Sequence, residues 1–467
     1  MSSLPRSTPE TQGLSAAALD SFVAALDASG QEIQTMMLLR HGHVVLEREW
    51  APYRLRDRHL LFSVSKSFTS MGIGLLVEQG KLSVEDKVVS FFDADELPDE
   101  ISDNLAAMEI RHLLTMTTGH AQDTIDALSR DRRMVRIFLG LEVEHEPGTV
   151  FVYNSGATYM LSAILQRLTG ETLLDYLRPR LFEPLGADEA IWAVSREGIN
   201  TGGWGLSLNT ESLANFSQFL LQRGSWHGRQ LVPAEWIDAA TSKQVPNDNE
   251  DNPDWQQGYG YQFWRSRHNA YRGDGAFGQY CLVLPEQDAT LVITSASPDM
   301  QATMDIVWEH LLPAMQGEAG DGTPPPAKLE LLPPAGPVPR GDGRTYRFES
   351  NHTGLTAIRL DPDGTCTLTL EAAAQAEYLN VAEGKSQEIV CAPGDWQEQT
   401  DQLQDPPQRL VTSVHADGDS GAFVATIRYL ETPYVATLRG RPDGGNLELD
   451  VRFNVSFGPA EITLHSL

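Results

Sequence analysis

The composition of the chain changes abruptly at residues 316–343, and this change constrains the fold more than any other feature of the sequence. The stretch reads QGEAGDGTPPPAKLELLPPAGPVPRGDG, which is dense in proline and glycine and has neither helical nor strand periodicity. Such sequences form semi-rigid linkers. A chain of 467 residues is also too long for one compact core. We therefore expect a first domain over residues 1–318, a linker over 319–342 and a second domain over 343–467.

Upstream of the linker, the sequence mixes helical and strand-like segments. Apolar residues recur at helical spacing in LSAAALDSFVAAL, YMLSAILQRL and SLANFSQFLLQRG, whereas TMMLLRHGHVVLEREW and YCLVLPEQDATLVITSA read as strands. The segments MMLLR and HVVLE, separated by His41 and Gly42, predict a hairpin with a two-residue turn, because glycine tolerates the backbone that this turn needs. The first domain is therefore predicted to be of the α+β class.

Downstream of the linker, short alternating segments replace the helical pattern. Examples are TYRFES, CTLTLEA, FVATIRYL, YVATLRG and NLELDVRFNV, divided by turn pairs such as Asp363-Gly364 and Asp443-Gly444. Regularly spaced short strands of this kind are typical of a small antiparallel barrel or sandwich. The second domain is therefore predicted to be all-β.

The charge balance and the apolar pattern argue against two kinds of partner. Acidic residues outnumber basic ones by 64 to 35, which gives a formal charge of −29. A chain this acidic is repelled by phosphate backbones and anionic lipid, so we expect neither nucleic acid nor membrane as a partner. No run of about 18 apolar residues occurs, and the first residues, MSSLPRSTPETQGLS, lack the apolar core of a secretory signal.

The cysteines and histidines indicate no disulfide framework and no metal site. The three cysteines, Cys281, Cys366 and Cys391, are odd in number and show no CxxC spacing, and the histidines form no HExxH motif. This usage fits a reducing compartment. We therefore predict a cytoplasmic protein without metal or other cofactor; the sequence leaves its oligomeric state open.

A cluster of hydroxyl side chains surrounds one lysine at residues 61–70, LFSVSKSFTS. Read as a buried helix, this region places Ser63 one turn from Lys66, while Gly72 and Gly74 permit close packing. Burial near a helix N-terminus would lower the pKa of Lys66, and a partly neutral amine can accept a serine proton. The alternative is an N-cap serine beside a lysine whose amine reaches solvent.

Two further stretches offer groups of the same chemistry. Tyr153 lies between the strand-like VFVY and an amphipathic helix, where it can project into a cleft and where a nearby lysine would stabilise its phenolate. In RGDGAFGQYCLVL, Gly273, Gly275 and Gly278 precede a strand pair and would let backbone N–H groups approach a substrate. The structural alternatives are a core aromatic and a glycine-rich hairpin.

Taken together and in order, these stretches resemble the serine β-lactamase/penicillin-binding-protein superfamily, in the branch of class C β-lactamases and family VIII esterases. The resemblance spans roughly residues 7–312 and rests on LFSVSKSFTS, IRHLLTMTTGH, EPGTVFVYNSGATYMLSAIL, LFEPLGADEAIW, TGGWGLSLNTESLANFSQFLL, GYGYQFW and DGAFGQYCLVLPEQD. It implies an antiparallel sheet flanked by helices, plus an all-helical part. Relatives often carry a lipocalin-like C-terminal domain, which the region after the linker would match.

The resemblance also implies roles for individual residues. Ser63 would be the acylated nucleophile, with Lys66 and Tyr153 sharing the proton transfers in a division that is left open. Backbone N–H groups of Ser63 and Ala276 would form the oxyanion hole, next to Gly275.

The chain departs from the family pattern at two motifs. The second motif usually reads Tyr-Ser-Asn, but here it is Tyr-Asn-Ser, which leaves the substrate-binding roles of Asn154 and Ser155 open. The third motif, Lys-Thr-Gly in β-lactamases, is replaced by Gly273-Asp274-Gly275, so the lysine that would bind a substrate carboxylate is missing.

These departures favour a carboxylesterase that acts on small esters through an acyl-enzyme. An amidase, a DD-peptidase or a β-lactamase is the alternative within the superfamily. A non-catalytic ligand-binding protein on the same fold is the alternative of another class.

Overall fold

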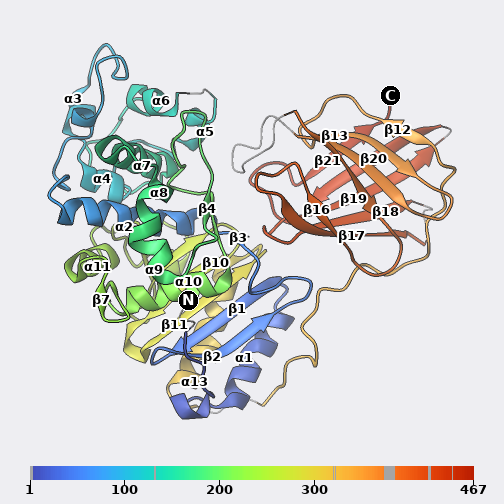
Figure 1. Cartoon of the computed structure of the whole chain (residues 1–467), viewed down its shortest axis with the longest axis horizontal. Helices are drawn as coiled ribbons and strands as arrows, with labels where there is room; N and C mark the ends of the chain where they lie inside the picture. The colour runs from blue at the N-terminus through green and yellow to red at the C-terminus, as the bar shows by residue number, and fades with distance from the viewer. Residues whose placement is uncertain are drawn as a thin grey trace. The chain divides into compact units, whose positions relative to one another are not determined.

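The chain forms two compact units (Figure 1). The computed structural model describes residues 4–130, 133–318, 320, 322–372, 384–418, 422–443 and 445–467. The first unit comprises residues 1–49 and 58–327, and the second comprises residues 50–57 and 328–467. The second unit therefore takes in an eight-residue segment that the sequence analysis assigned to the first domain, and the predicted linker is divided between the two units.

The first unit is built on an antiparallel sheet in the order β2-β1-β11-β10-β9-β8. In that order the strands are His43–Glu49, Ile33–Arg40, Ala289–Ser295, Gln279–Leu284, Tyr271–Gly275 and Trp264–Arg265. Strands β1 and β2 form the predicted hairpin, whose turn residues His41 and Gly42 both have positive φ. The central strands β1, β10 and β11 are buried on both faces, so the sheet is an interior layer.

Helices cover this sheet and form a separate helical part. Helix α10 (Thr210–Leu221) packs on β1, β10 and β11, while α1 (Ala16–Ala28) packs against the helices that follow the sheet. The latter are α12 (Met300–Ile306), η7 (Val307–Leu311) and α13 (Leu312–Met315). The helical part contains α2 (Ser65–Glu78), α4 (Ile110–Leu114), α5 (Ile125–Leu128), α6 (Met134–Gly140), α7 (Ser155–Thr169) and α8 (Leu173–Leu177).

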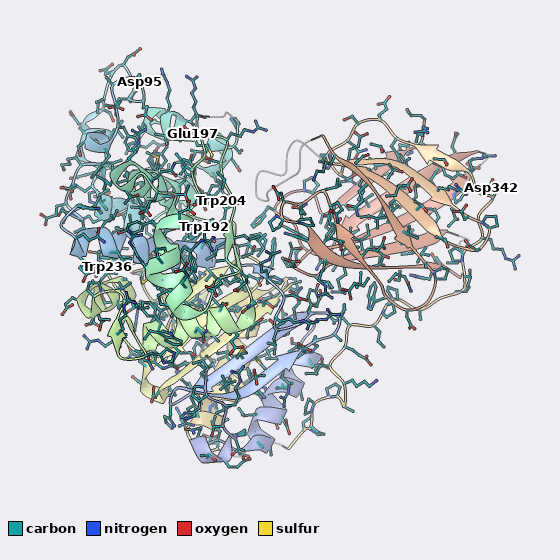
Figure 2. The ribbon with its side chains drawn as sticks, viewed as in Figure 1. Asp95, Trp192, Glu197, Trp204, Trp236 and Asp342 are labelled. Carbon is teal, nitrogen blue, oxygen red and sulfur yellow. The ribbon has the colours of Figure 1, made fainter. Side chains whose placement is uncertain are left out.

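Two glycines let helix α2 pack closely on its neighbours, as the sequence predicted. A Cβ at Gly72 would lie 2.8 Å from a methyl carbon of Leu165 on α7. A Cβ at Gly74 would lie 2.5 Å from the ring of Trp236 on α11 (Ala234–Thr241), whose side chain is labelled in Figure 2. A larger residue at Gly72 would displace the end of the Leu165 side chain, and one at Gly74 would displace the Trp236 ring.

The remaining elements of the first unit are short. They are η1 (Glu10–Gln12), β3 (His59–Leu60), η2 (Phe62–Val64), η3 (Val88–Phe91), α3 (Asp103–Ala107), η4 (Arg178–Phe182), α9 (Glu183–Leu185), β4 (Ile191–Trp192), β5 (Leu206–Leu208), β6 (Ser225–Trp226), β7 (Arg229–Gln230), η5 (Pro253–Trp255) and η6 (Pro285–Gln287). Strands β3, β5 and β4 form a small sheet that leads directly into η2.

The second unit is all-β, as predicted. Its strands follow one another as an antiparallel meander in two sheets, β12 to β15 and β16 to β21. They are Thr345–Arg347, Leu355–Leu360, Cys366–Glu371, Ser386–Cys391, Gln397–Asp401, Gln408–Ala416, Phe423–Tyr429, Val435–Asp443, Asn446–Phe453 and Glu461–His465. The two sheets share one apolar core, and the backbone N–H of Leu467 donates to the carbonyl of Arg347, which joins the last segment to the first strand.

The segment at residues 50–57 is integrated into this second unit. The N–H of Ala51 donates to the carbonyl of Leu329, and the N–H of Leu331 donates back to Ala51. Tyr53 is buried against Val411 and Leu430, and Asp57 is ion-paired with Arg409. The chain thus leaves the first unit after β2, contributes to the second and returns at β3.

Within the described ranges, no helix has the length and apolar character needed to cross a membrane.

Candidate active site

Ser63 is the one hydroxyl of the LFSVSKSFTS cluster that is not buried. The other hydroxyls point into the protein, where most of them donate hydrogen bonds to backbone carbonyl groups. Ser65 donates to the Phe62 carbonyl, Ser67 to the Gln262 carbonyl and Thr69 to the Gly202 carbonyl, while the buried Ser70 hydroxyl has no hydrogen-bond partner in the described part of the chain. The structure therefore leaves Ser63 as the hydroxyl that a substrate can reach.

The backbone is strained immediately before Ser63. Phe62, the first residue of η2, has φ of 46°, which is the left-handed region that side chains other than glycine rarely adopt. Its ring packs edge-on against Phe277 in the β9–β10 turn, with 5.5 Å between ring centroids. This contact holds Ser63 in a sharp turn ahead of helix α2.

Lys66 lies directly against Ser63, at the distance that the helical spacing predicted. Its Nζ donates to Ser63 Oγ at 2.9 Å, to Ser155 Oγ at 3.2 Å and to the Gly203 carbonyl at 2.9 Å. The side chain is only 1% exposed. Burial lowers the pKa of the Lys66 amine to about 8, although the negative charges of Asp123 and Asp274 oppose that shift. A substantial fraction of this amine is therefore neutral near pH 8.

Tyr153 completes the group from the opposite side. Its ring stacks on Trp264 with centroids 5.1 Å apart, and Lys66 Nζ lies 4.6 Å from the ring centroid. The Tyr153 hydroxyl is near enough to Ser63 for the serine to act on its pKa, which it lowers. Burial and the nearby Asp274 raise the pKa of Tyr153 far above its usual range. The expectation of a lysine-stabilised phenolate is therefore wrong: Tyr153 is a neutral hydroxyl that can donate or relay a proton.

The inverted second motif is explained by where helix α7 begins. Asn154 is the N-cap of α7; its Oδ1 accepts hydrogen bonds from the Ala157 N–H at 3.3 Å and the Thr124 hydroxyl at 2.8 Å. The Asn154 side chain is fully buried in this role. Ser155, the first residue of α7, is partly exposed and faces Lys66. The structure thus brings Ser155, and not Asn154, to the reactive amine.

The turn between β9 and β10 lies against the segment that carries Ser63. A Cβ at Gly275 would lie 2.1 Å from the Leu61 carbonyl oxygen, so only glycine permits this approach. The turn is closed by the Gly278 N–H, which donates to the Gly275 carbonyl at 3.2 Å. Ala276, within the turn, is partly exposed, and its N–H has no acceptor among the described residues. The N–H groups of Ala276 and Ser63 remain the predicted oxyanion donors.

A buried ion pair on β9 flanks Gly273, the residue at the position of the missing third-motif lysine. Arg272 Nε donates to Asp274 Oδ2 at 2.9 Å, with the side chains 0% and 6% exposed. The guanidinium also lies over the ring of Trp255, 4.2 Å from its centroid. The ring of Trp264 lies between this pair and the reactive group: it stacks on Tyr153, and the Arg272 guanidinium lies 6.0 Å from its centroid.

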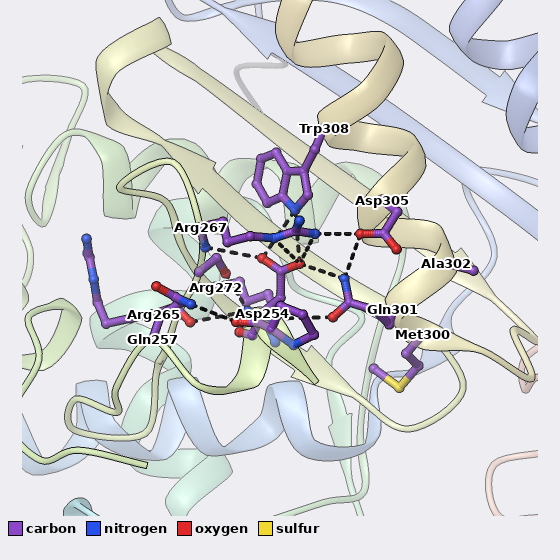
Figure 3. Close-up of polar contacts among 12 residues, drawn as sticks. Asp254, Gln257, Arg265, Arg267, Arg272, Met300, Gln301, Ala302, Asp305 and Trp308 are labelled. Atoms are coloured by element: carbon purple, nitrogen blue, oxygen red, sulfur yellow. Dashed lines mark hydrogen bonds and ion pairs between the residues drawn. The ribbon is translucent and has the colours of Figure 1, made fainter. Parts of the chain in front are cut away.

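A second buried carboxylate, Asp254, fixes the loop behind the ion pair (Figure 3). It accepts hydrogen bonds from Arg267 Nη2 at 2.7 Å, Gln301 Nε2 at 2.8 Å and Trp308 Nε1 at 3.0 Å. Its carbonyl accepts from Arg272 Nη1 at 2.9 Å. These bonds hold the pKa of Asp254 below its usual range in spite of its burial. The network ties η5 to α12 and η7 and thereby supports Trp255 and Arg272.

Three participants in this geometry are absent from the sequence-based set: Asp123, Gly203 and Trp264. Gly203 contributes a backbone carbonyl, and a backbone group leaves no trace in the side-chain pattern. Asp123 follows no recognisable motif. Trp264 lies in the GYGYQFW segment that supported the family resemblance, but its place on β8, directly beside β9, is a tertiary pairing that the sequence analysis did not predict.

Within the described residues, the one group of side chains able to converge on a metal ion is Asp93, Asp95 and Glu96. Asp93 and Asp95 are exposed, as the surface position of Asp95 in Figure 2 shows, and Arg167 is ion-paired with Glu96. The predicted active-site residues do not belong to this group.

A serine, a buried lysine that donates a hydrogen bond to it and a tyrosine whose ring lies beside the lysine, set between a helical part and an antiparallel sheet, define the β-lactamase/transpeptidase type of serine hydrolase fold. A family model described as Beta-lactamase matches residues 19–313. The chain therefore belongs to the β-lactamase family.

Named relatives span several kinds of hydrolase. The 6-aminohexanoate-dimer hydrolase of Paenarthrobacter ureafaciens is 25% identical over 323 residues, which are 63% of this chain and 81% of that protein. The lovastatin esterase of Penicillium rubens is 26% identical over 203 residues, 38% of this chain and 50% of that one. These matches place the chain among serine hydrolases without distinguishing an esterase from an amidase.

Some solved structures are similar over almost the whole chain. The match to the octameric penicillin-binding protein homologue from Pyrococcus abyssi covers 96% of this chain and 99% of that one, with a TM-score of 0.52 and 15% sequence identity. At this identity the match shows a shared fold, and it extends through the C-terminal all-β unit.

Proposed function

We propose that the protein is a serine hydrolase that acts on small esters through an acyl-enzyme at Ser63. The observation that carries the proposal is the hydrogen bond of 2.9 Å between Lys66 Nζ and the accessible Ser63 Oγ, made by an amine whose pKa burial has lowered to about 8. An ordinary surface lysine would be protonated at neutral pH and unable to accept the serine proton.

In acylation, Ser63 Oγ attacks the substrate carbonyl carbon while its proton moves to the neutral Lys66 amine. The carbonyl oxygen becomes an oxyanion, which the backbone N–H groups of Ser63 and Ala276 stabilise. The C–O bond to the leaving alcohol then breaks, and the alkoxide takes a proton from Tyr153, whose pKa is raised by burial and whose hydroxyl lies near Ser63. The proton held by Lys66 restores the Tyr153 hydroxyl, and the acyl group stays on Ser63.

In deacylation, water attacks the acyl carbonyl and the same groups act in reverse. Tyr153 and Lys66 together take the proton of the attacking water and return one to Ser63 Oγ, which leaves as a hydroxyl. Ser155 and the Gly203 carbonyl keep the Lys66 amine in place, because each accepts one of its hydrogen bonds.

The charges around the site support neutral acyl groups over anionic ones. Asp123 and Asp274 both act on Lys66, and β9 carries glycine where β-lactamases place the carboxylate-binding lysine. The similarity to a protein named as an esterase supports the ester class. Amides are the second candidate, because the 6-aminohexanoate-dimer hydrolase matches a larger share of the chain. Placement in the cytoplasm remains a prediction.

The test compares hydrolysis of p-nitrophenyl butyrate by the wild type, Ser63→Ala and Ser70→Ala. Ser70 is a matched control, because it lies on α2, the helix that follows Ser63, and its buried hydroxyl makes no hydrogen bond among the described residues. We expect turnover to vanish in Ser63→Ala and to persist in Ser70→Ala. Mass spectrometry with a fluorophosphonate should show one adduct, on Ser63.

Equal turnover in the wild type and Ser63→Ala would overturn the mechanism. If no variant hydrolyses the ester but the fluorophosphonate still labels Ser63, the ester preference is wrong and p-nitroanilides become the substrates to test. If neither reaction occurs, the fold serves ligand binding.

A further inference from the structure

Asp123 lies in the segment between α4 and α5 and bridges two parts of the helical region. Its Oδ1 accepts a hydrogen bond from the Ser155 N–H at 2.9 Å and another from the Ile125 N–H at 3.1 Å. The side chain is partly exposed, unlike the neighbouring Thr124, which is buried. One carboxylate oxygen therefore fixes both the start of α5 and the start of α7.

The bond to Ser155 determines how α7 meets the reactive amine. The first N–H groups of a helix have no partner within the helix and must be satisfied by capping groups. Asn154 satisfies the N–H of Ala157, and Asp123 satisfies that of Ser155. The Ser155 hydroxyl accepts a hydrogen bond from Lys66 Nζ at 3.2 Å. Asp123 therefore fixes the backbone from which Ser155 reaches Lys66, two residues beyond Tyr153.

Asp123 also supplies negative charge to the site. The charged and titratable groups that face Lys66 are Asp123, Asp274 and Tyr153, and the influence of Asp123 on the amine exceeds that of Asp274. Asp274 is neutralised in part by its ion pair with Arg272. Asp123 forms no ion pair within the described part of the chain. Its carboxylate is thus a net anion beside a lysine that must take up a proton.

We propose that Asp123 is a positioning residue of the active site, which holds Ser155 against Lys66 by hydrogen bonding and favours proton uptake by Lys66 through its charge. The inference rests on the proposed function, because it assigns Asp123 to the proton acceptor of that mechanism. The two contributions are separable, since asparagine keeps the acceptor oxygen and loses the charge, whereas alanine loses both.

The first experiment follows the titration of Lys66 directly. The chain has six lysines, so lysine labelled with ¹³C at Cε gives a spectrum in which Lys66→Met assigns the Lys66 signal. We expect Asp123→Asn to move the Lys66 midpoint downward by half a pH unit or more. Asp126→Asn, an equal change of charge at an exposed position three residues away, should leave it within 0.1 to 0.2 units. Equal midpoints in the wild type and Asp123→Asn would overturn the charge role.

The second experiment measures kcat and KM for p-nitrophenyl butyrate. Asp123→Ala should lower kcat at least tenfold with little change in KM, because Ser155 and Lys66 lose their alignment. Asp123→Asn should retain kcat within about threefold on the high-pH plateau, and Asp126→Asn should match the wild type. A wild-type kcat in Asp123→Ala would overturn the positioning role. If the wild type lacks Ser63-dependent turnover, the proposed function fails, while the Lys66 titration still decides the role of the Asp123 charge.

Discussion

Asp274 and Arg272 are two residues apart on strand β9 and form an ion pair of 2.9 Å that is closed off from solvent. A buried pair of this kind is costly to break, because the remaining partner becomes an uncompensated buried charge. Because its two charges offset each other, the pair also does not supply the free positive charge that the missing lysine would bring to the site. Its structural and electrostatic consequences can be measured separately.

The structural consequence is a loss of stability when either partner is removed. We expect Arg272→Met to lower the free energy of unfolding of the first unit by about 3 kcal/mol. Arg223→Met is the matched control, because Arg223 and Asp238 form an exposed ion pair in the same unit, and its effect on the free energy of unfolding should be much smaller. Urea unfolding followed by tryptophan fluorescence gives both values. Similar losses of unfolding free energy in the two variants would show that burial does not make the Arg272 ion pair more costly to break.

The electrostatic consequence is discrimination against anionic substrates. Asp123 and Asp274 both face Lys66. Their negative charges should repel a substrate whose acyl chain ends in a carboxylate. We expect kcat/KM for mono-p-nitrophenyl succinate to be at least tenfold below that for p-nitrophenyl butyrate, whose acyl chain has the same number of carbons. Asp274→Asn should narrow the difference. Equal values for the two esters in the wild type would contradict the charge argument.

The pH dependence of turnover should report the titration of Lys66. Its pKa in the free enzyme is about 8, so kcat/KM should fall tenfold per pH unit below pH 7 and level off above pH 9. In Lys66→Arg the guanidinium stays protonated, so kcat should drop at least a thousandfold at every pH while the fold persists. A profile that is flat between pH 6 and 9 would exclude Lys66 as the proton acceptor.

The lowered pKa of Lys66 also predicts that this residue, although useful for catalysis, reduces the stability of the folded protein. The folded-state pKa of Lys66, about 8, lies below the 10.5 of an ordinary lysine in water, so between these pH values the unfolded chain binds more protons. The free energy of unfolding therefore rises as the pH increases from about 8 to 10.5. Below pH 8 the full loss of stability caused by burying Lys66 is present. We expect Lys66→Met to be more stable than the wild type by up to about 3 kcal/mol at pH 7. The difference should shrink as the pH approaches 10.5; an advantage that is independent of pH would indicate better packing alone.

Glycine at position 275 should be essential for activity. A Cβ there would lie 2.1 Å from the Leu61 carbonyl oxygen, so Gly275→Ala must displace either β9 or the segment before Ser63. We expect kcat to fall at least a hundredfold, with a melting temperature lowered by several degrees. Gly140→Ala is the control: it lies at the end of α6 with open space around it, and alanine should be neutral or slightly stabilising there. Full activity in Gly275→Ala would mean that the turn does not need this close approach.

Local patterns accounted for much of the site because its central contacts are close in sequence. The spacing of Ser63 and Lys66 placed them one helical turn apart, and Gly72 and Gly74 predicted close packing of α2. Tyr153 required the family resemblance, because its partner Ser63 lies 90 residues earlier. The pKa of Tyr153 depends on Asp274 and on burial, which no local pattern reveals.

The contributions that escaped prediction depend on tertiary structure. Whether Asn154 or Ser155 reaches Lys66 depends on the residue at which α7 begins, and helix boundaries are poorly defined by sequence. Gly203 acts through its carbonyl, and Asp123 through two backbone N–H groups far apart in the chain. The segment at residues 50–57 reads as an ordinary loop, because its partners follow the linker.

That segment imposes an order on biosynthesis. Residues 50–57 emerge from the ribosome about 270 residues before residue 328, where the rest of their unit begins. At about 5–20 residues per second, the delay is on the order of tens of seconds. During this time Tyr53 lacks the apolar partners that bury it, Val411 and Leu430. The nascent chain therefore cannot form its second unit until the C-terminal strands have been synthesised. A chaperone that shields this short stretch would act on it before that point.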